Sequence, residues 1–149
     1  MKYKPMADQP LGWACSMLGK GYLQLLNQKL KHLEIDRYYY TVLLIHANNG
    51  EINQQELAGL LETEKVSVSR IVDYLTMNGF VKKVTRTDDR RKHYLALTSK
   101  AVDSVQQIKE AIAATNEEVL AGISEDQRRV LTTVMGEVKM NLKRNNQNK

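Results

Sequence analysis

The segment of residues 63–98 constrains the fold of this 149-residue chain more than any other segment. Apolar residues recur in its first half at the i, i+3, i+4, i+7 spacing of one buried helix face. These residues are Val68, Ile71, Val72 and Leu75. Gly79 is placed to end that helix, because glycine readily takes the left-handed conformation that follows a helix C-terminus. Residues 80–84 and 93–97 then alternate well enough to be two strands of a hairpin.

The face of this predicted helix that points away from the core consists mostly of small, hydroxylated or cationic side chains. Successive helical residues turn by about 100° around the axis, so the members of the face can be identified from the sequence. They are Val66, Ser67, Arg70, Asp73, Tyr74 and Met77, with Lys65 and Ser69 on the flanks. Such a face suits the major groove of DNA, where small side chains contact base edges and arginine bonds bidentately to guanine.

The loop between the two predicted strands is strongly basic. From Lys82 to Lys92, six Lys or Arg residues stand against two Asp, a surplus of four positive charges. A cationic loop beside a groove-reading helix would contact phosphates and place an arginine in the minor groove. A charged loop alone is more often a solvated turn, and an amphipathic helix alone is more often a packed helix. The prediction of DNA binding therefore depends on the order and close spacing of the helix, the two strands and the basic loop.

This segment resembles the signature of MarR-type winged helix-turn-helix repressors. The matching positions are Leu75, Gly79, Phe80, Val81, Asp89, Arg90, Arg91, Leu95, Leu97 and Thr98. The resemblance implies that Asp89, Arg90 and Arg91 brace the wing and that an arginine near its tip enters the minor groove. One departure is Arg86, at a position where many members of the family carry an acidic residue. Arg86 is expected to add a phosphate contact to the tip.

A shorter helix is predicted just before the groove-reading one. Asn53 and Glu56 match a capping box, in which each side chain bonds to the backbone N–H of the other residue. The expected inner face is Leu57, Leu60 and Leu61. Thr63 is the expected N-cap of the next helix, and Ile52 is expected to pair as a short strand with the hairpin. Two short helices joined by a tight turn form a helix-turn-helix, whose second helix enters the groove.

The N-terminal part of the chain is predicted to be an arm followed by two helices. Pro5 and Pro10 keep residues 1–10 out of a helix. A helix is expected from Leu11 to about Leu33, and Asp36 is expected to cap a second helix over residues 37–47. The broad apolar stripe of the first helix is Leu18, Tyr22, Leu25, Leu26, Leu30 and Leu33.

Two long helices are predicted after the hairpin, with Gly122 between them. The first runs from about Ser99 to Ala121, and its apolar side is Val102, Val105, Ile108, Ile112 and Val119. Ser124 and Gln127 form a second capping box that starts the final helix. Its stripe, close to a coiled-coil seam, is Val130, Leu131, Val134, Val138 and Leu142. These helices have little globular domain to pack against, so we expect a two-fold dimer, the alternative being that they fold back on their own domain.

The predicted fold is mainly α with a small β-hairpin wing: a winged helix-turn-helix core flanked by N- and C-terminal dimerisation helices. The expected boundaries are 1–34 for the arm and first dimerisation helix, 35–98 for the DNA-binding domain and 99–149 for the C-terminal dimerisation helices. Residues 143–149 are polar and expected to fray.

Composition narrows the class of protein. The net charge of +5 favours a polyanionic partner. No apolar run reaches the roughly 18–20 residues that span a bilayer, and no apolar signal core follows Lys2 and Lys4, which predicts a cytoplasmic protein without a membrane partner. The single Cys15 excludes an intrachain disulfide framework, and no phosphate loop, nucleophile elbow or metal-spaced His pair is present. We therefore expect no enzyme activity, no metal and no cofactor.

The function predicted from these observations is that of a transcriptional regulator, a bacterial repressor by resemblance, that binds double-stranded DNA as a homodimer. Two recognition helices ~34 Å apart would contact a pseudo-palindromic operator. Base contacts are expected chiefly from Ser67, Ser69 and Arg70. The full set of expected DNA-contacting residues is Thr63, Lys65, Val66, Ser67, Ser69, Arg70, Tyr74, Arg86, Asp89, Arg90, Arg91 and Lys92.

The resemblance also implies release from DNA by a small ligand, commonly an aromatic or phenolic anion, bound between the dimerisation helices and the DNA-binding lobe. The residues expected to line such a pocket are Trp13, Tyr22, Tyr38, Tyr39, Tyr40 and His46. Aromatic side chains at these positions are more often plain core residues, and His46 has no second ligand at a metal spacing. Core packing is therefore the alternative role for this set.

Two further functions stay open from the sequence. Cys15 lies near the start of the first helix, as the reactive cysteine does in the organic-hydroperoxide sensors of the family, although its neighbours Trp13, Ala14, Ser16 and Met17 do not reproduce that branch. A buried, inert cysteine is the competing interpretation. The second function is a winged helix that binds a protein, which salt-insensitive binding would favour.

Overall fold

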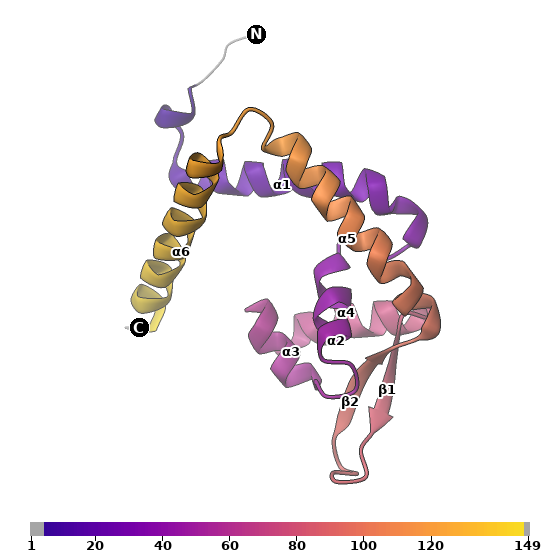
Figure 1. Cartoon of the computed structure of the whole chain (residues 1–149). Helices are drawn as coiled ribbons and strands as arrows, with labels where there is room; N and C mark the ends of the chain where they lie inside the picture. Colours follow the sequence, from indigo (N-terminus) through magenta and orange to yellow (C-terminus); the bar gives the residue numbers. More distant parts are fainter. Residues whose placement is uncertain (1–4, 148–149) are drawn as a thin grey trace. The chain divides into compact units, whose positions relative to one another are not determined.

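The computed structural model describes residues 5–147 of the chain and has the predicted mainly α architecture with one hairpin (Figure 1). Short 3-10 helices cover Met6–Asp8 and Lys31–Leu33. The other elements are α1 (Leu11–Leu30), α2 (Tyr39–Ala47), α3 (Gln54–Leu61), α4 (Lys65–Met77), β1 (Val81–Thr85), β2 (His93–Leu97), α5 (Ser99–Val119) and α6 (Glu125–Gln147). They fall into two compact units, one up to Thr115 and one from Asn116 onward.

The first unit has a hydrophobic core to which α1 to α5 and both strands contribute. Among its largest fully buried side chains are Leu26, Leu30, Ile35, Ile45, Leu57, Phe80, Leu95 and Ile108. The predicted inner face of α4 is confirmed, since Val68, Val72 and Leu75 are fully buried and Ile71 packs against them. Burying this stripe fixes which side of α4 remains outside.

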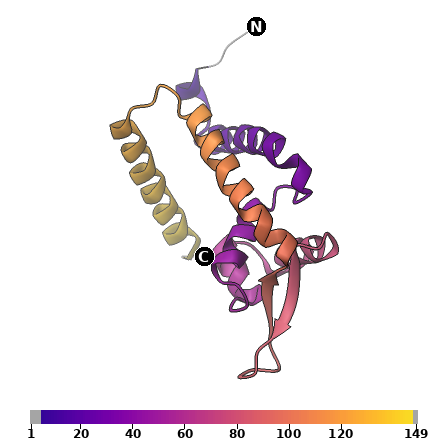
Figure 2. The ribbon, with the colours of Figure 1, turned by 45° about the vertical axis from the view of Figure 1, so that its right-hand side comes forward.

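The wing is an antiparallel pair in which Val81 faces Leu97 and Thr85 faces His93. Gly79 has a φ of +76°, the left-handed conformation expected of it between α4 and β1. The predicted pairing of Ile52 with the hairpin is confirmed by a bridge to Leu95, whose N–H donates to the Ile52 carbonyl at 2.7 Å. Seen from two directions, the hairpin projects from the helices on the side away from α1 (Figures 1 and 2).

The capping box of α3 is confirmed, because Glu56 N–H donates to Asn53 Oδ1 and Asn53 N–H donates to Glu56 Oε2, both at 2.9 Å. The prediction for Leu60 is wrong, since its side chain is exposed and Ala58 is buried instead. α3 packs on α4 along a face that passes through Leu57, Ala58 and Leu61, which leaves Leu60 outside.

Two predicted helix caps are also wrong. Asp36 has a left-handed φ of +50° and lies in a turn, because Ile35 is buried and its carbonyl accepts from Tyr38 N–H before α2 begins. Thr63 completes the end of α3, where its N–H donates to the Ala58 carbonyl at 3.1 Å. Glu64 therefore takes the N-cap position of α4, and its side chain makes no capping hydrogen bond.

α5 buries a different set of residues from the one expected. Val105 and Ile108 are buried as predicted, whereas Val102 and Val119 are exposed. The rest of the buried face is Ala101, Ser104, Ala111 and Thr115. The Ser124–Gln127 capping box of α6 is confirmed by backbone to side-chain bonds of 2.9 and 3.2 Å.

α6 has no buried residue among those described. The predicted fraying from residue 143 is wrong as far as Gln147, because the helix continues to that residue. The predicted features at residues 1–4 and 148–149 lie outside the described residues. Within residues 5–147, no helix is both long and apolar enough to cross a membrane.

Candidate nucleic-acid interface

The outer face of α4 is available to a partner over most of its length. Lys65 and Arg70 are exposed, and Ser67 and Ser69 are partly exposed. Val66 and Met77 keep 62% and 87% of their surface despite being apolar. Glu64 makes no side-chain capping hydrogen bond at the start of α4, where the positive end of the helix dipole favours an anion.

Tyr74 differs from the rest of the expected outward set. It is half-buried, its hydroxyl donates to the Glu34 carbonyl at 3.1 Å, and its ring lies edge-on to Tyr38 with the centroids 5.3 Å apart. Burial raises the pKa of Tyr74, and the nearby charges of Asp36 and Glu34 raise it further. The Tyr74 hydroxyl therefore attaches α4 to the segment before α2.

Arg86, at the point where β1 leads into the wing loop, is held by two partners. Its Nε and Nη2 donate to the carboxylate oxygens of Asp88 at 2.9 and 2.8 Å, and its guanidinium carbon lies 5.2 Å from the centroid of the Tyr94 ring. The hydrogen bonds to Asp88 raise the pKa of Arg86, and those from Arg86 lower the pKa of Asp88. Arg86 is thus bound within the wing.

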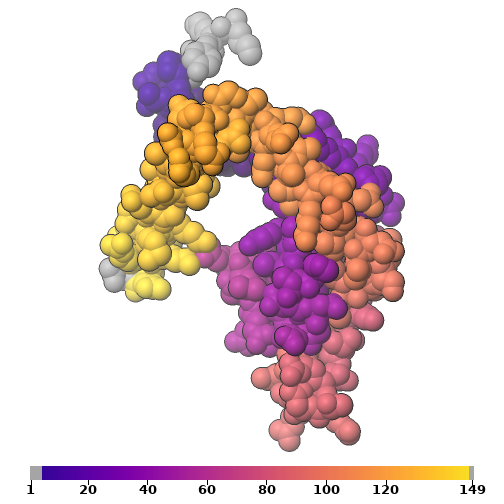
Figure 3. All heavy atoms as spheres, in the orientation of Figure 1, coloured from indigo at the N-terminus to yellow at the C-terminus, as the bar shows by residue number. Residues whose placement is uncertain are grey.

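The other acidic residue of the loop, Asp89, shapes the turn. One of its oxygens accepts from Arg91 N–H at 3.1 Å, and the other lies 3.8 Å from Lys92 Nζ. Within residues 5–147, the wing cations that form no ion pair are Lys82, Lys83, Arg90 and Arg91. All four are exposed, and the space-filling view shows the wing as a narrow lobe (Figure 3).

Sequence reasoning missed Asp88 and Tyr94 as partners of Arg86. In the sequence, Asp88 contributes to the charge balance of the loop and Tyr94 belongs to a predicted strand, and neither pattern indicates a contact with Arg86. The available signal was the i, i+2 spacing of Arg86 and Asp88 inside a tight loop.

The six residues expected to line a ligand pocket do not surround one cavity in the single chain. Trp13 is 61% exposed and Tyr40 is 51% exposed, and His46 is exposed as well. Tyr22, Tyr38 and Tyr39 pack against the core, and burial raises the pKa of Tyr22 and Tyr39. Cys15 is exposed on α1, so the interpretation of a buried cysteine does not hold for one chain alone. Residues 5–147 contain no group of three or more His, Cys, Asp or Glu able to hold a metal ion.

This arrangement of α3, α4 and a β-hairpin defines a winged helix-turn-helix protein. Residues 39–93 match the model of the MarR family. The fold of the chain is that of MarR-family transcriptional regulators.

Three solved structures illustrate the similarity. The transcriptional regulator PA3341 is 26% identical, with a TM-score of 0.76 over 91% of this chain and 99% of the other. A MarR-family regulator from Listeria monocytogenes, complexed with 26mer DNA, is 21% identical with a TM-score of 0.80 over 90% and 89%. The PcaV regulator from Streptomyces coelicolor, in complex with its natural ligand, is 21% identical with a TM-score of 0.77 over 93% and 97%.

Proposed function

We propose that this protein is a transcriptional repressor that binds a pseudo-palindromic operator in double-stranded DNA as a homodimer and is released by a small ligand. The observation that carries the proposal is the exposed polar face of α4 beside a wing with four cations that pair with no described residue. A relative of the same fold is complexed with DNA.

The base-contacting residues in this proposal are Ser67, Ser69 and Arg70, with Lys65 and Val66 at the start of α4. Arginine is suited to guanine and Val66 to a thymine methyl, and each good bidentate pair gives about 1–3 kcal/mol of discrimination. The hydroxyl of Tyr74 is already bonded to Glu34, so Tyr74 is assigned to holding α4 in place. Thr63 lies at the turn before α4, where it would contact the DNA backbone.

The phosphate contacts in this proposal come from the wing. Arg90 and Arg91 are assigned to phosphates or the minor groove, because no described residue pairs with their charges. Lys92 is held only loosely by Asp89, at 3.8 Å, and contributes a weaker contact. Arg86 is assigned to shaping the wing with Asp88, in place of the phosphate contact expected from the sequence.

The dimer part of the proposal is supported by the apolar residues left exposed on α6. Val130, Leu131, Val134 and Leu142 all remain exposed, and such a stripe in water normally marks an interface. α1 adds Leu11 and Leu18, which are exposed too. A second copy supplies the two-fold symmetry that a pseudo-palindromic site requires. Replacing Leu131 with Glu is expected to give monomers in sedimentation velocity and to lower operator affinity strongly, whereas Glu137→Gln leaves the dimer intact.

The experiment that tests DNA binding is a titration of fluorescent duplex DNA at several salt concentrations. Each phosphate contact releases counterions, so the logarithm of the affinity falls linearly with the logarithm of the salt concentration, with a slope of about −0.9 per contact. We expect a steep negative slope. An affinity insensitive to salt would reject the proposal in favour of a protein partner.

A further inference from the structure

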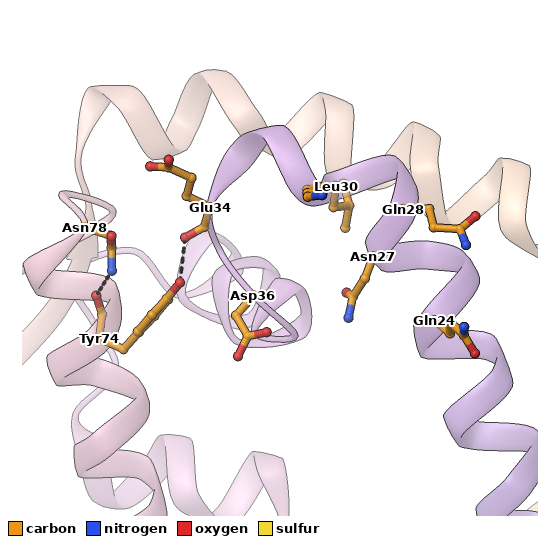
Figure 4. A pocket seen from close by; sticks show the side chains of 9 residues that line it. Gln24, Asn27, Gln28, Leu30, Glu34, Asp36, Tyr74 and Asn78 are labelled. Carbon is orange, nitrogen blue, oxygen red and sulfur yellow. Dashed lines mark hydrogen bonds between the residues drawn. The ribbon is translucent and has the colours of Figure 1, made fainter.

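A polar groove of about 700 Å³ lies in the first unit between α1 and α4 (Figure 4). Its walls come from the C-terminal half of α1, the turn before α2 and the C-terminal half of α4. Gln24 and Asn27 project from α1 toward the groove, Asp36 lies in the middle of the view and Tyr74 stands on the opposite side (Figure 4). None of the six residues expected to line a ligand pocket lines this groove, and its aromatic residue is Tyr74, which was expected to contact DNA.

Two oxygen acceptors of this groove lack donors. Asn27 Oδ1 is buried and has no hydrogen-bond partner. The carboxylate of Asp36 makes no hydrogen bond or ion pair with any residue from 5 to 147. Buried polar atoms in folded proteins nearly always have a partner, so the orphan Asn27 Oδ1 indicates that a donor comes from outside the chain, and the exposed carboxylate of Asp36 is accessible to the same ligand.

The charge of the lining is opposite to that of the whole protein. Asp36 and Glu34 outnumber the single lysine, Lys31, whereas the full chain carries +5. Burial is the main cause that raises the pKa of the Tyr74 hydroxyl, and the charges of Asp36 and Glu34 raise it further. The ring of Tyr74 adds a π-face, which attracts ammonium groups. A protonated amine is the ligand that matches all of these groups.

The groove is built partly from the recognition helix itself. The Tyr74 hydroxyl donates to the Glu34 carbonyl at 3.1 Å, and Asn78 Nδ2 donates to the Tyr74 carbonyl at 2.8 Å (Figure 4). Glu34 and Asp36 both have left-handed backbone φ values, of +58° and +50°. Asp36 is two residues from Glu34, so a ligand bound to this turn lies close to the hydrogen bond between Tyr74 of α4 and Glu34.

We propose that this groove binds a small organic amine, whose N–H groups bond to Asp36 and Asn27 and whose charge lies against the Tyr74 ring. Occupation of the groove favours one position of α4 and so changes DNA affinity; this second step rests on the proposed function. The proposed ligand is therefore a cation, whereas the family resemblance implies an aromatic or phenolic anion.

The test is calorimetry of the full-length protein without DNA. The probe is putrescine, and 1,4-butanediol and succinate serve as neutral and dianionic molecules with the same four-carbon chain. We expect putrescine to bind once per chain and the other two not to bind. A net positive protein repels a dication in general, so saturable binding must come from a local site.

Two substitutions with opposite expected effects on putrescine affinity locate the site. Asp36→Asn is expected to weaken putrescine binding by about tenfold, since it removes a charge-assisted contact while asparagine still accepts the left-handed φ. Lys31→Gln is expected to strengthen binding several-fold, because it removes the like charge. Glu117→Gln, which removes an exposed carboxylate of the second unit, is the matched control and should change nothing. Thermal unfolding verifies that each variant is folded.

The inference is overturned if putrescine does not bind, if succinate binds more tightly, or if Asp36→Asn and Glu117→Gln have equal effects. The calorimetry contains no DNA, so its result stands even if the DNA-binding proposal fails. The proposed coupling between ligand binding and the position of α4 is tested separately with Tyr74→Phe, which removes only the hydroxyl. If the Tyr74 hydroxyl transmits the coupling, DNA changes the putrescine affinity of the wild-type protein but not that of Tyr74→Phe. A variant whose putrescine affinity still differs with and without DNA would contradict coupling through Tyr74.

Discussion

The guanidinium of Arg86 holds both carboxylate oxygens of Asp88, from Nε to Oδ1 at 2.9 Å and from Nη2 to Oδ2 at 2.8 Å. The same group lies over the ring of Tyr94, a buried residue near the loop end of the hairpin. A bidentate pair fixes geometry more than a single contact does. Both charged side chains remain solvent-accessible, so the pair contributes little to global stability, and its consequence is the shape of the wing.

Arg86→Ala is therefore expected to lower operator affinity several-fold without changing its salt dependence. A residue that shapes the wing releases no counterions of its own, whereas Arg90→Ala removes one phosphate contact from each subunit of the dimer and should make the slope less negative by about 1.8, at about 0.9 per contact. Fluorescence anisotropy at four salt concentrations measures both quantities. Lys109→Ala, which removes an exposed cation of α5, is the control for net charge. A change in slope for Arg86→Ala equal to that for Arg90→Ala would assign Arg86 to a phosphate.

Arg70→Ala is expected to relax sequence preference. The guanidinium of Arg70 is exposed on the outer face of α4, and loss of a bidentate base contact costs about 1–3 kcal/mol at one position of the site. The affinity for non-specific DNA should change much less. Competition between operator and scrambled duplexes measures the ratio, with Arg90→Ala as the comparison, which should weaken both affinities about equally. Equal losses on both duplexes for Arg70→Ala would exclude a base contact.

The contribution of Asp88 to DNA affinity is expected to stay constant between about pH 5 and pH 8. Arg86 lowers the pKa of Asp88 below its ordinary 3.8, so the favourable pair is complete above that value and is lost only as the pH falls through the lower pKa. The hydrogen bonds to Asp88 raise the pKa of Arg86, so its guanidinium stays charged throughout this range. The ratio of wild-type to Asp88→Asn affinity, measured at each pH, should be flat. A ratio that fell across this range would show that another titrating group controls the wing.

Asn53→Ala is expected to destabilise the fold by about 1 kcal/mol, because it removes the side-chain cap from the helix that supports α4. The capped N–H belongs to Glu56, and the reciprocal bond from Glu56 to Asn53 N–H is weakened at the same time. Urea denaturation followed by circular dichroism gives the free energy of unfolding. Gln55→Ala, at an exposed position of the first turn, is the control. A decrease in the free energy of unfolding no larger than that of the control would show that the capping box does not stabilise the fold.

Much of the fold follows from periodicity and local chemistry. The stripe of Val68, Val72 and Leu75 sets the inner face of α4, and the Asn53–Glu56 box sets the start of α3. Gly79 ends α4 in the conformation that glycine favours. Such features depend on residues a few positions apart, so the sequence reports them directly.

The features that escaped prediction depend on contacts between distant residues. Asp36 does not cap α2, because burial of Ile35 forces a turn there. Tyr74 lies on the predicted outer face, yet its hydroxyl is bonded to Glu34, forty positions earlier. The groove between α1 and α4 exists only once these helices meet, and polar residues such as Gln24 and Asn27 carry no periodic signal that would mark them.

Selection of bound sequences from a random duplex pool shows whether α4 and the wing of a dimer recognise a defined DNA sequence. We expect an enriched inverted repeat whose half-sites are centred about one helical turn apart, roughly 10–10.5 base pairs. Enrichment should be lost with Arg70→Ala. Recovery of no common motif, or of a single half-site without a repeat, would contradict a sequence-specific dimeric regulator.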